Sequence, residues 1–325
     1  MRDDRLSVGV WCYGMGSDRY VEKGYKDYID FEKKIELISN LKGVKGVEVT
    51  FPQDLNEKNF DNIVELLESR NLEISAIGVE LVCDAEWKTG SFTSYDPERR
   101  KKSIELTTRA MDVAYKLGAK TVNLWLGQDG FDYVFQNDYS DAWINLLESL
   151  KKCADHNPDI NLGLEYKVSE PRMSCMVNSG GKALAAAVLT GRKNVGVTLD
   201  VGHAFNAGEN PAEIASVLMA EKRLFHIHLN DNYRIADDDM PLGTVHWPQY
   251  LELFYWLERL GYNGWLSLDL YPYRDDPSAA CEVSLNFISK IKSLAKEFVK
   301  NSDFENIKGL PPSAIINQLI NRVFY

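Results

Sequence analysis

The chain has 325 residues, of which 45% are hydrophobic and 26% are charged, and its formal net charge is −11. This charge disfavours non-specific binding to nucleic acid, which depends on clustered lysine and arginine. No apolar run approaches the roughly 20 residues of a membrane span, and the N-terminal residues MRDDRLSVGVW have no segment of signal-peptide length. The five cysteines are scattered, with no CxxC pair. We therefore expect a cytoplasmic protein with reduced thiols and with neither nucleic acid nor membrane as a partner.

Short β-rich runs alternate with helical patterns along the chain. The runs that resemble buried strands are RLSVGVW (5–11), KGVEVTF (45–51), LEISAIGVE (72–80), KTVNLWL (120–126), INLGLEYK (160–167), NVGVTLD (194–200), RLFHIHLN (223–230) and GWLSLDLY (264–271). Asp96-Pro97, Asn210-Pro211 and Asp276-Pro277 each place a capping side chain before a proline at the first helical position. Eight strand–helix units in this length predict an α/β fold, a closed (β/α)8 TIM barrel.

An open doubly wound sheet is the structural alternative, but no GxGxxG or GxxxxGK loop follows any strand. We expect the barrel to occupy residues 1–298 as one domain. Residues 299–325 form a C-terminal tail with a short apolar helix. Such a tail packs on its own barrel or on a neighbouring subunit. We expect a homo-oligomer, with a different partner subunit as the alternative.

The ends of the last four predicted strands carry polar residues in an apolar context. Successive side chains of a strand point to opposite faces, so the aliphatic residues that face the helices assign the residues between them to the barrel interior. Near the mouth, where the active sites of such barrels lie, the inward side chains are Glu165, Asp200, His228 and Asp269. His226 shares this face one layer deeper, and we interpret it as a hydrogen-bonded core residue.

Three carboxylates that converge inside a barrel would raise one another's pKa values. A divalent cation would remove this conflict, and oxygen-rich ligands with one imidazole suit manganese, magnesium or cobalt. A single inward carboxylate is commonly satisfied by a salt bridge, and a lone histidine is commonly a core residue. Four such residues on consecutive strand ends favour a metal site.

An acidic triplet follows the seventh predicted strand, within RIADDDMPLG (234–243). The simplest interpretation of such a run is a solvated loop. This loop can also fold over the barrel mouth, where Asp237 and Asp239, together with His203, would hold a second ion in the manner of two-metal sites.

Several segments together resemble xylose isomerase and the wider group of xylose isomerase-like barrels, which includes L-rhamnose isomerase and the D-tagatose 3-epimerase type. The resemblance runs from residue 9 to residue 271. Its motifs are GSFTSYDPERR (90–100), LGAKTVNLWLGQDG (117–130), LEYKVSEPR (164–172), DVGH (200–203), LFHIHLN (224–230) and the Asp-x-Asp of residues 237–239.

The resemblance implies roles for individual residues. The first metal site would be formed by Glu165, Asp200, His228 and Asp269. The second would be formed by His203, Asp237 and Asp239, with Asp200 bridging the two ions. Lys167 matches a lysine that polarises the sugar carbonyl. Trp11 and Trp125 match aromatic walls of the substrate site, for which plain core packing is an equal alternative, and His203 matches a substrate-binding position. Arg234 resembles a substrate-binding arginine of the epimerases.

Two departures from xylose isomerase bear on the reaction. The ligands Asp200 and His228 follow the pattern of rhamnose isomerase and the epimerases. Where xylose isomerase has a ring-opening histidine after the second strand, this chain has Thr50-Phe51-Pro52. Proline transfers no proton, so we expect slow turnover of cyclic aldoses such as xylose; His246 is a weak substitute.

The leading hypothesis from sequence is a metal-dependent aldose–ketose isomerase, with Lys167 stabilising the carbonyl oxygen. The alternatives within the family are a sugar 3-epimerase, in which Glu165 and Asp269 act as paired acid and base, and a lyase acting on 3-keto glycosides, like the C-glycoside deglycosidases. An endonuclease IV-type hydrolase shares the barrel, but it needs more histidines and a basic surface. A carbohydrate-binding barrel without activity is a further alternative, and the complete ligand set argues against it.

Overall fold

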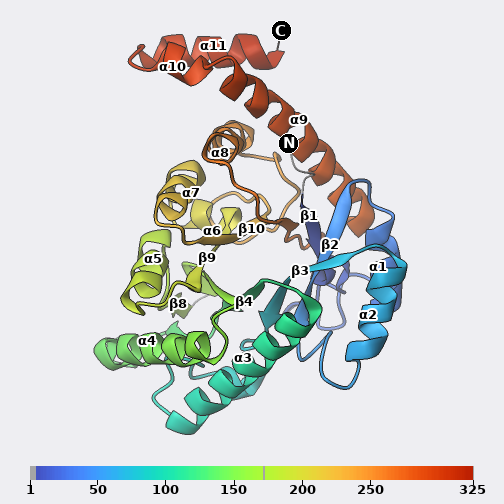
Figure 1. The fold of residues 1–325 in the computed structure, drawn as a ribbon, viewed down its shortest axis with the longest axis vertical. Coiled ribbons are helices and arrows are strands. Elements are labelled where there is room, and N and C mark those ends of the chain that lie inside the picture. The colour runs from blue at the N-terminus through green and yellow to red at the C-terminus, as the bar shows by residue number, and fades with distance from the viewer. Residues whose placement is uncertain (1–4, 171–172, 325) are drawn as a thin grey trace.

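The computed structural model describes residues 5–170 and 173–324. Residues 1–4, 171–172 and 325 lie outside the described residues; they include the ends of the predicted barrel and tail and the last two residues of the 164–172 motif. Eight parallel strands close into a barrel, with helices around it (Figure 1). In order around the barrel they are β1 (Leu6–Gly9), β11 (Leu266–Leu268), β10 (Leu224–Leu229), β9 (Val195–Asp200), β6 (Asn161–Glu165), β4 (Thr121–Trp125), β3 (Glu73–Val79) and β2 (Val44–Phe51).

These strands confirm the predicted closed (β/α)8 barrel. The predicted first and last strands both extend beyond the observed ones. After β1, Val10–Tyr13 turn into the 3₁₀ helix η1, closed by the bond from the Gly14 amide to the Trp11 carbonyl. After β11 the Tyr271 amide bonds to the Asp239 carbonyl, so the chain leaves the barrel sooner than its apolar pattern predicts.

The surrounding helices follow the strands in the chain. They are α1 (Phe31–Ser39), α2 (Phe60–Ser69), α3 (Pro97–Leu117), α4 (Tyr139–His156), α5 (Gly180–Leu189), α6 (Val201–Asn206), α7 (Pro211–Ala220), α8 (Trp247–Leu260) and α9 (Pro277–Lys300), with the 3₁₀ helix η2 (Ala85–Trp87) before α3. As predicted, the side chains of Asp96, Asn210 and Asp276 accept amide hydrogen bonds at the starts of α3, α7 and α9.

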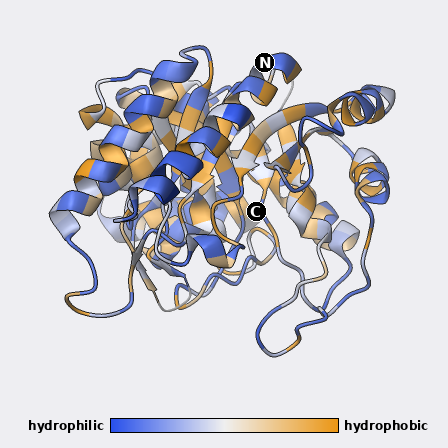
Figure 2. Ribbon diagram, turned by 90° about the horizontal axis from the view of Figure 1, so that it is seen from below, coloured by the Kyte–Doolittle hydropathy of each residue, from blue (hydrophilic) through white to orange (hydrophobic). Residues whose placement is uncertain are grey.

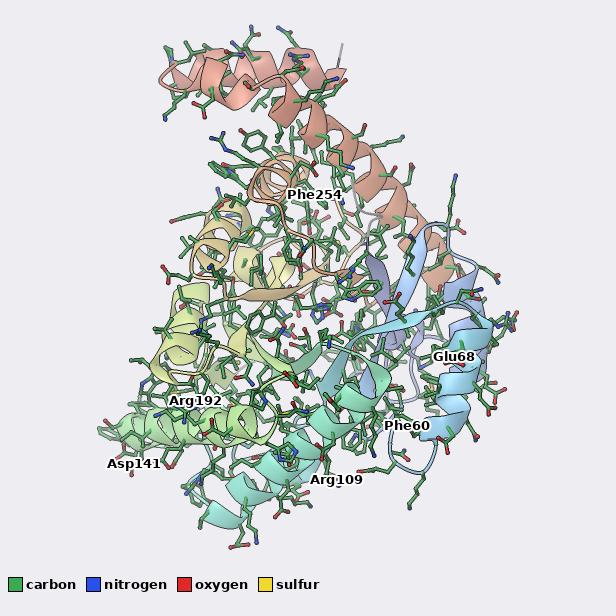
Figure 3. The ribbon with its side chains drawn as sticks, viewed as in Figure 1. Phe60, Glu68, Arg109, Asp141, Arg192 and Phe254 are labelled. Atoms are coloured by element: carbon green, nitrogen blue, oxygen red, sulfur yellow. The ribbon has the colours of Figure 1, made fainter. Side chains whose placement is uncertain are left out.

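Apolar residues gather on the strands and on the inner faces of the helices, whereas loops and outer helix faces are hydrophilic (Figure 2). On the outer surface, Arg109 and Arg192, labelled in Figure 3, pair with Glu57 and Asp155 at 2.7 and 2.6 Å. Exposed pairs of this kind add little to stability. The barrel is therefore held mainly by its apolar core. No helix among the described residues is both long enough and apolar enough to cross a membrane.

A small antiparallel sheet lies outside the barrel, in the order β5 (Gly130–Phe131), β8 (Met173–Cys175), β7 (Ser169–Glu170). Beside it, the buried carboxylate of Asp129 accepts bonds from the amides and hydroxyls of Ser91 and Thr93. These bonds fasten the loop that carries the GSFTS motif.

The C-terminal tail forms α10 (Asp303–Ile307) and α11 (Pro312–Phe324), which project from the barrel at the end of α9 (Figure 1). Leu319 and Val323 pack against the core. Ile316 and Ile320 are exposed. The tail thus contacts its own barrel, and its role in a homo-oligomer remains a prediction.

Candidate metal centre

The four inward residues predicted as ligands converge at the barrel mouth. Glu165 and Asp200 end β6 and β9, His228 lies in β10, and Asp269 follows β11. Each offers a ligand atom, and these atoms all lie within 4.8 Å of one another. From His228 Nδ1 the distances are 3.4 Å to Glu165 Oε1, 3.3 Å to Asp269 Oδ2 and 3.9 Å to Asp200 Oδ2. Ligands at about 2.1 Å from one ion lie roughly 3–4 Å apart, so this spacing fits a shared cation.

The charges of the cluster also fit a cation. Asp200 is fully buried. Burial, and next the charges of Asp269 and Glu165, raise the pKa of Asp200 to about 7 against the opposing effect of His203. Asp239 lies nearby, and burial together with Asp237, Asp269 and Asp200 raises its pKa well above the usual range. Positive charge placed among these carboxylates would relieve their repulsion.

Asp200 also starts the helix that follows it. Its Oδ1 accepts the His203 amide at 2.8 Å, capping α6, while its Oδ2 accepts from Asn230 Nδ2 at 2.9 Å. A Cβ atom at Gly202 would lie 1.9 Å from the Asn230 amide oxygen, so only glycine fits there. The DVGH motif thus contains a candidate ligand, a helix start and a glycine in close contact with the Asn230 side chain, all within four residues.

The residues predicted for a second ion lie beside the first cluster. His203 Nδ1 is 3.3 Å from Glu165 Oε1, and its Nε2 is 3.1 Å from Asp237 Oδ2. Among the described residues, two groups have ligand atoms close enough for one ion, and neither contains Asp237 or Asp239. The second ion therefore stays a prediction.

Lys167 reaches the same region and pairs with the carboxylates of Glu170 and Asp237, the latter at 2.8 Å. Burial favours the neutral amine, but the charges of Asp237 and Glu170 outweigh it and raise the pKa of Lys167 above its ordinary value. Its Nζ lies 5.0 Å from the ring centre of Trp125. The predicted lysine and one predicted aromatic wall are thus adjacent, and the lysine stays protonated.

Two side chains hold the outer oxygens of the cluster. Trp11 Nε1 donates to Asp269 Oδ1 at 2.5 Å, and Asn123 Nδ2 donates to Glu165 Oε2 at 2.6 Å. Trp11 was predicted at the site, but only as a wall. Asn123 was missed, although it shares the inward phase of Trp125 on β4.

Arg234 is exposed, and its described side-chain contacts are with residues outside the cluster. Its Nε donates to His246 Nε2 at 3.0 Å, and its guanidinium lies over the ring of Phe205. His246 Nδ1 lies 2.7 Å from the buried carboxylate of Asp231. Both ring nitrogens of His246 are therefore engaged, which weakens it as a ring-opening group.

Glu48, on β2, was also missed. Its Oε2 lies 2.9 Å from His226 Nε2 and 3.0 Å from His228 Nε2, and all three residues are buried. They form the second group with ligand atoms close together. His226 is a hydrogen-bonded core residue, as expected. A signal for Glu48 was present: it is a lone carboxylate between Val47 and Val49, in the inward phase of a buried strand.

The molecule is a closed (β/α)8 barrel with a carboxylate–histidine cluster at the C-terminal ends of its strands. Residues 35–291 match the model of the xylose isomerase-like TIM barrel family, and the chain belongs to that family.

Solved structures with the same fold include a D-tagatose 3-epimerase-like protein, with a TM-score of 0.72 and 20% identity over 91% of this chain and 99% of that one. An L-ribulose 3-epimerase has a TM-score of 0.72 and 16% identity over 95% and 100%. The IOLI protein with a bound zinc atom has a TM-score of 0.66 and 18% identity over 89% and 98%. At these identities the likeness shows a shared fold.

Proposed function

We propose that the protein is a divalent-metal-dependent epimerase that inverts the configuration of a carbon next to the keto group of a sugar. The observation that carries this proposal is the arrangement of Glu165 and Asp269. Each has one oxygen near His228 Nδ1 and the other held by an N–H donor, Asn123 in one case and Trp11 in the other. The two strands that position them, β6 and β11, are separated in the ring by β9 and β10. The carboxylates thus approach the axis from different sides.

Two bases on different sides suit inversion of a carbon. One carboxylate removes the proton from the carbon beside the carbonyl; the C–H electron pair forms a C=C bond and the carbonyl oxygen becomes an enolate. The other group starts as a protonated carboxyl and gives its proton to the opposite face, which leaves it ionised, restores the carbonyl and inverts the configuration of the carbon. A divalent cation bound by Glu165, Asp200, His228 and Asp269 would stabilise negative charge on the carbonyl and neighbouring hydroxyl oxygens.

The remaining site residues have supporting roles in this proposal. Lys167, kept protonated by Asp237 and Glu170, adds positive charge beside the substrate oxygens. Trp11 and Trp125 would wall the substrate and His203 would bind it. Arg234 remains a predicted substrate-binding residue, although it contacts His246 and Phe205 in this structure. The names of the similar solved structures, a D-tagatose 3-epimerase-like protein and an L-ribulose 3-epimerase, support a ketose as the substrate.

Aldose–ketose isomerisation is the second candidate, and Lys167 favours it because a protonated lysine can polarise an aldehyde oxygen. Against it, β2 ends at Phe51 and Pro52 follows, so no histidine stands there to open a cyclic sugar. A lyase would use the same proton abstraction on a 3-keto glycoside, followed by loss of the substituent on the adjacent carbon.

The test is a panel of ketoses, aldoses and 3-keto glycosides in D₂O with manganese, cobalt or magnesium, with products identified by NMR. Epimerisation through two bases places solvent deuterium at the inverted carbon. Transfer of the substrate's own hydrogen between neighbouring carbons gives an isomerised sugar without deuterium, and elimination releases the substituent; either result would replace the proposal. Turnover of xylose or glucose at ordinary enzyme rates, about 1–10³ per second, would contradict the inference from Pro52.

A further inference from the structure

Beneath the ligand cluster, one carboxylate serves two histidines. Glu48 is fully buried, and its Oε2 lies within hydrogen-bond distance of His226 Nε2 and His228 Nε2. Both histidines belong to β10, and Glu48 belongs to β2, with β11 and β1 between these strands in the ring. The contact therefore crosses the barrel interior and does not follow from strand pairing.

The two ring nitrogens of His228 face different partners. Nδ1 faces the carboxylates of Glu165, Asp200 and Asp269, whereas Nε2 faces only Glu48 among its described contacts. An ionised carboxylate accepts hydrogen bonds and donates none, so the Nε2 atoms of both histidines carry hydrogen. In the neutral ring that a metal ion requires, the Nδ1 lone pair of His228 is then directed at the ligand cluster. A metal-binding histidine usually donates its other N–H in this way.

His226 completes the arrangement. It donates to the same Glu48 oxygen, and its ring meets that of His228 edge-on, with centroids 5.1 Å apart and an interplanar angle of 86°. Glu48 cannot turn away from His228 without losing both bonds. This explains why the HIH sequence places two inward histidines two residues apart.

A second ion among Glu48, His226 and His228 is the competing interpretation. Neutral imidazole has one nitrogen that donates and one that accepts. His228 could bind ions on both sides only by losing both ring protons. The group of Glu165, Asp200, His228 and Asp269 is the better site for an ion, because it offers three carboxylates whereas the other group offers one. An ion bound there excludes an ion bound by Glu48, His226 and His228.

We propose that Glu48 is a positioning residue that fixes the ring orientation and tautomer of His228. His226 holds Glu48 in place, and the inference rests on the proposed metal site. Removing this support weakens metal binding because the ring is free to turn and the proton is free to move to Nδ1. Losses of about 10–100-fold in metal affinity are typical when such a partner is removed.

The experiment measures cobalt affinity of the full chain by calorimetry, without substrate. Glu48→Leu is expected to weaken binding about 10–100-fold, and Glu48→Gln, which keeps an acceptor but loses the charge, is expected to fall between Glu48→Leu and wild type. Asp129→Asn is the matched control, because it also alters a buried carboxylate with several hydrogen bonds. Unchanged cobalt affinity in a folded Glu48→Leu protein would overturn the proposal. A drop in the number of bound ions from two to one, with unchanged affinity of the site formed by Glu165, Asp200, His228 and Asp269, would also overturn it.

A second readout covers the case in which Glu48→Leu does not fold. Long-range ¹⁵N–¹H NMR of histidine-labelled protein, metal-free and magnesium-loaded, should show a proton on Nε2 of His228 in both forms, with Glu48→Gln shifting this signal. A bare Nε2 in wild type overturns the inference. If wild type binds no divalent cation, the proposed function fails, while the NMR result still decides the role of Glu48.

Discussion

The two halves of the barrel contribute differently to the site. The half formed by β6, β9, β10 and β11 supplies all four candidate ligands. The half formed by β1, β2, β3 and β4, with η1, supplies side chains that bond to those ligands: Trp11, Glu48 and Asn123. One half would hold the ion, and the other fixes the orientation of the groups that hold it.

The difference teaches how each kind of residue can be recognised. A ligand set has a chemical signature, because acidic and histidine residues at consecutive strand ends have few structural explanations. A supporting residue has no such signature of its own. The role of such a residue becomes clear only from the ligand atom that it contacts, as for Trp11, Glu48 and Asn123.

The largest expected effect comes from the proposed bases in the ligand half. Glu165→Gln and Asp269→Asn should each lower turnover by about 10²–10⁴-fold, since a general acid–base group is lost. If the two act on opposite faces, each variant should exchange the substrate proton for deuterium in only one of the two epimers. NMR in D₂O measures this, and exchange of both epimers by either variant would contradict the assignment. Asp129→Asn serves as control, with ordinary turnover expected per folded molecule.

A smaller effect is expected from the supporting half. Trp11→Phe removes the hydrogen bond to Asp269, and Asn123→Ala removes the one to Glu165. We expect each change to weaken cobalt binding or turnover by about 10-fold, at the low end of such effects. Calorimetry and steady-state kinetics measure the change. Losses as large as those of the bases would erase the distinction between the two halves.

Removal of the ion should lower stability by a measurable amount, because the buried carboxylates are then left to repel one another. At a cation concentration of about 100 times Kd, binding stabilises the folded state by roughly 2.7 kcal/mol. Scanning calorimetry of chelator-treated protein should show a melting temperature a few degrees lower, restored by added manganese. A melting temperature unaffected by chelator and by added cation would argue against the site.

The smallest effect concerns the second ion. Lys167 and His203 already engage Asp237 Oδ2, so any ion there must displace them, and we expect it to bind weakly or only with substrate. Asp237→Asn combined with Asp239→Asn should reduce the substrate-dependent ion count while leaving the first site within a few-fold of wild type. Equal counts in variant and wild type, with unchanged turnover, would leave these residues as a loop that pairs with Lys167.

The fold was predictable from sequence because strand and helix patterns alternate with little ambiguity. Errors were confined to strand ends: Trp11 lies in η1 and Asp269 just beyond β11. At these ends the backbone stops pairing with neighbouring strands and forms hydrogen bonds within turns or to loops. Some of these bonds depend on partners that are distant in the sequence, such as Asp239. Apolar pattern alone carries no information on those partners.

The candidate ligands were predictable because alternation along a strand fixes which side chains face the axis. The contacts of Arg234 were not predictable, since its loop places it against His246 and Phe205. Glu48 was visible in the same alternation. Its partners, His226 and His228, lie nearly 180 residues away in the chain, and only the closed barrel brings them together.

The junction at Asp200 has a consequence for how members of such a family diverge. β9 ends at Asp200 and α6 begins at Val201, so no linker separates ligand from helix. Insertions there would displace both the candidate ligand Asp200 and the start of α6, and Gly202 admits no larger residue. Residues 14–30, after η1, and the exposed residues 233–236, in the connection between β10 and α8, have room for change. We therefore expect family members with different substrates to differ in the sequence and length of these two segments. The DVGH motif at residues 200–203 should stay constant in length and composition.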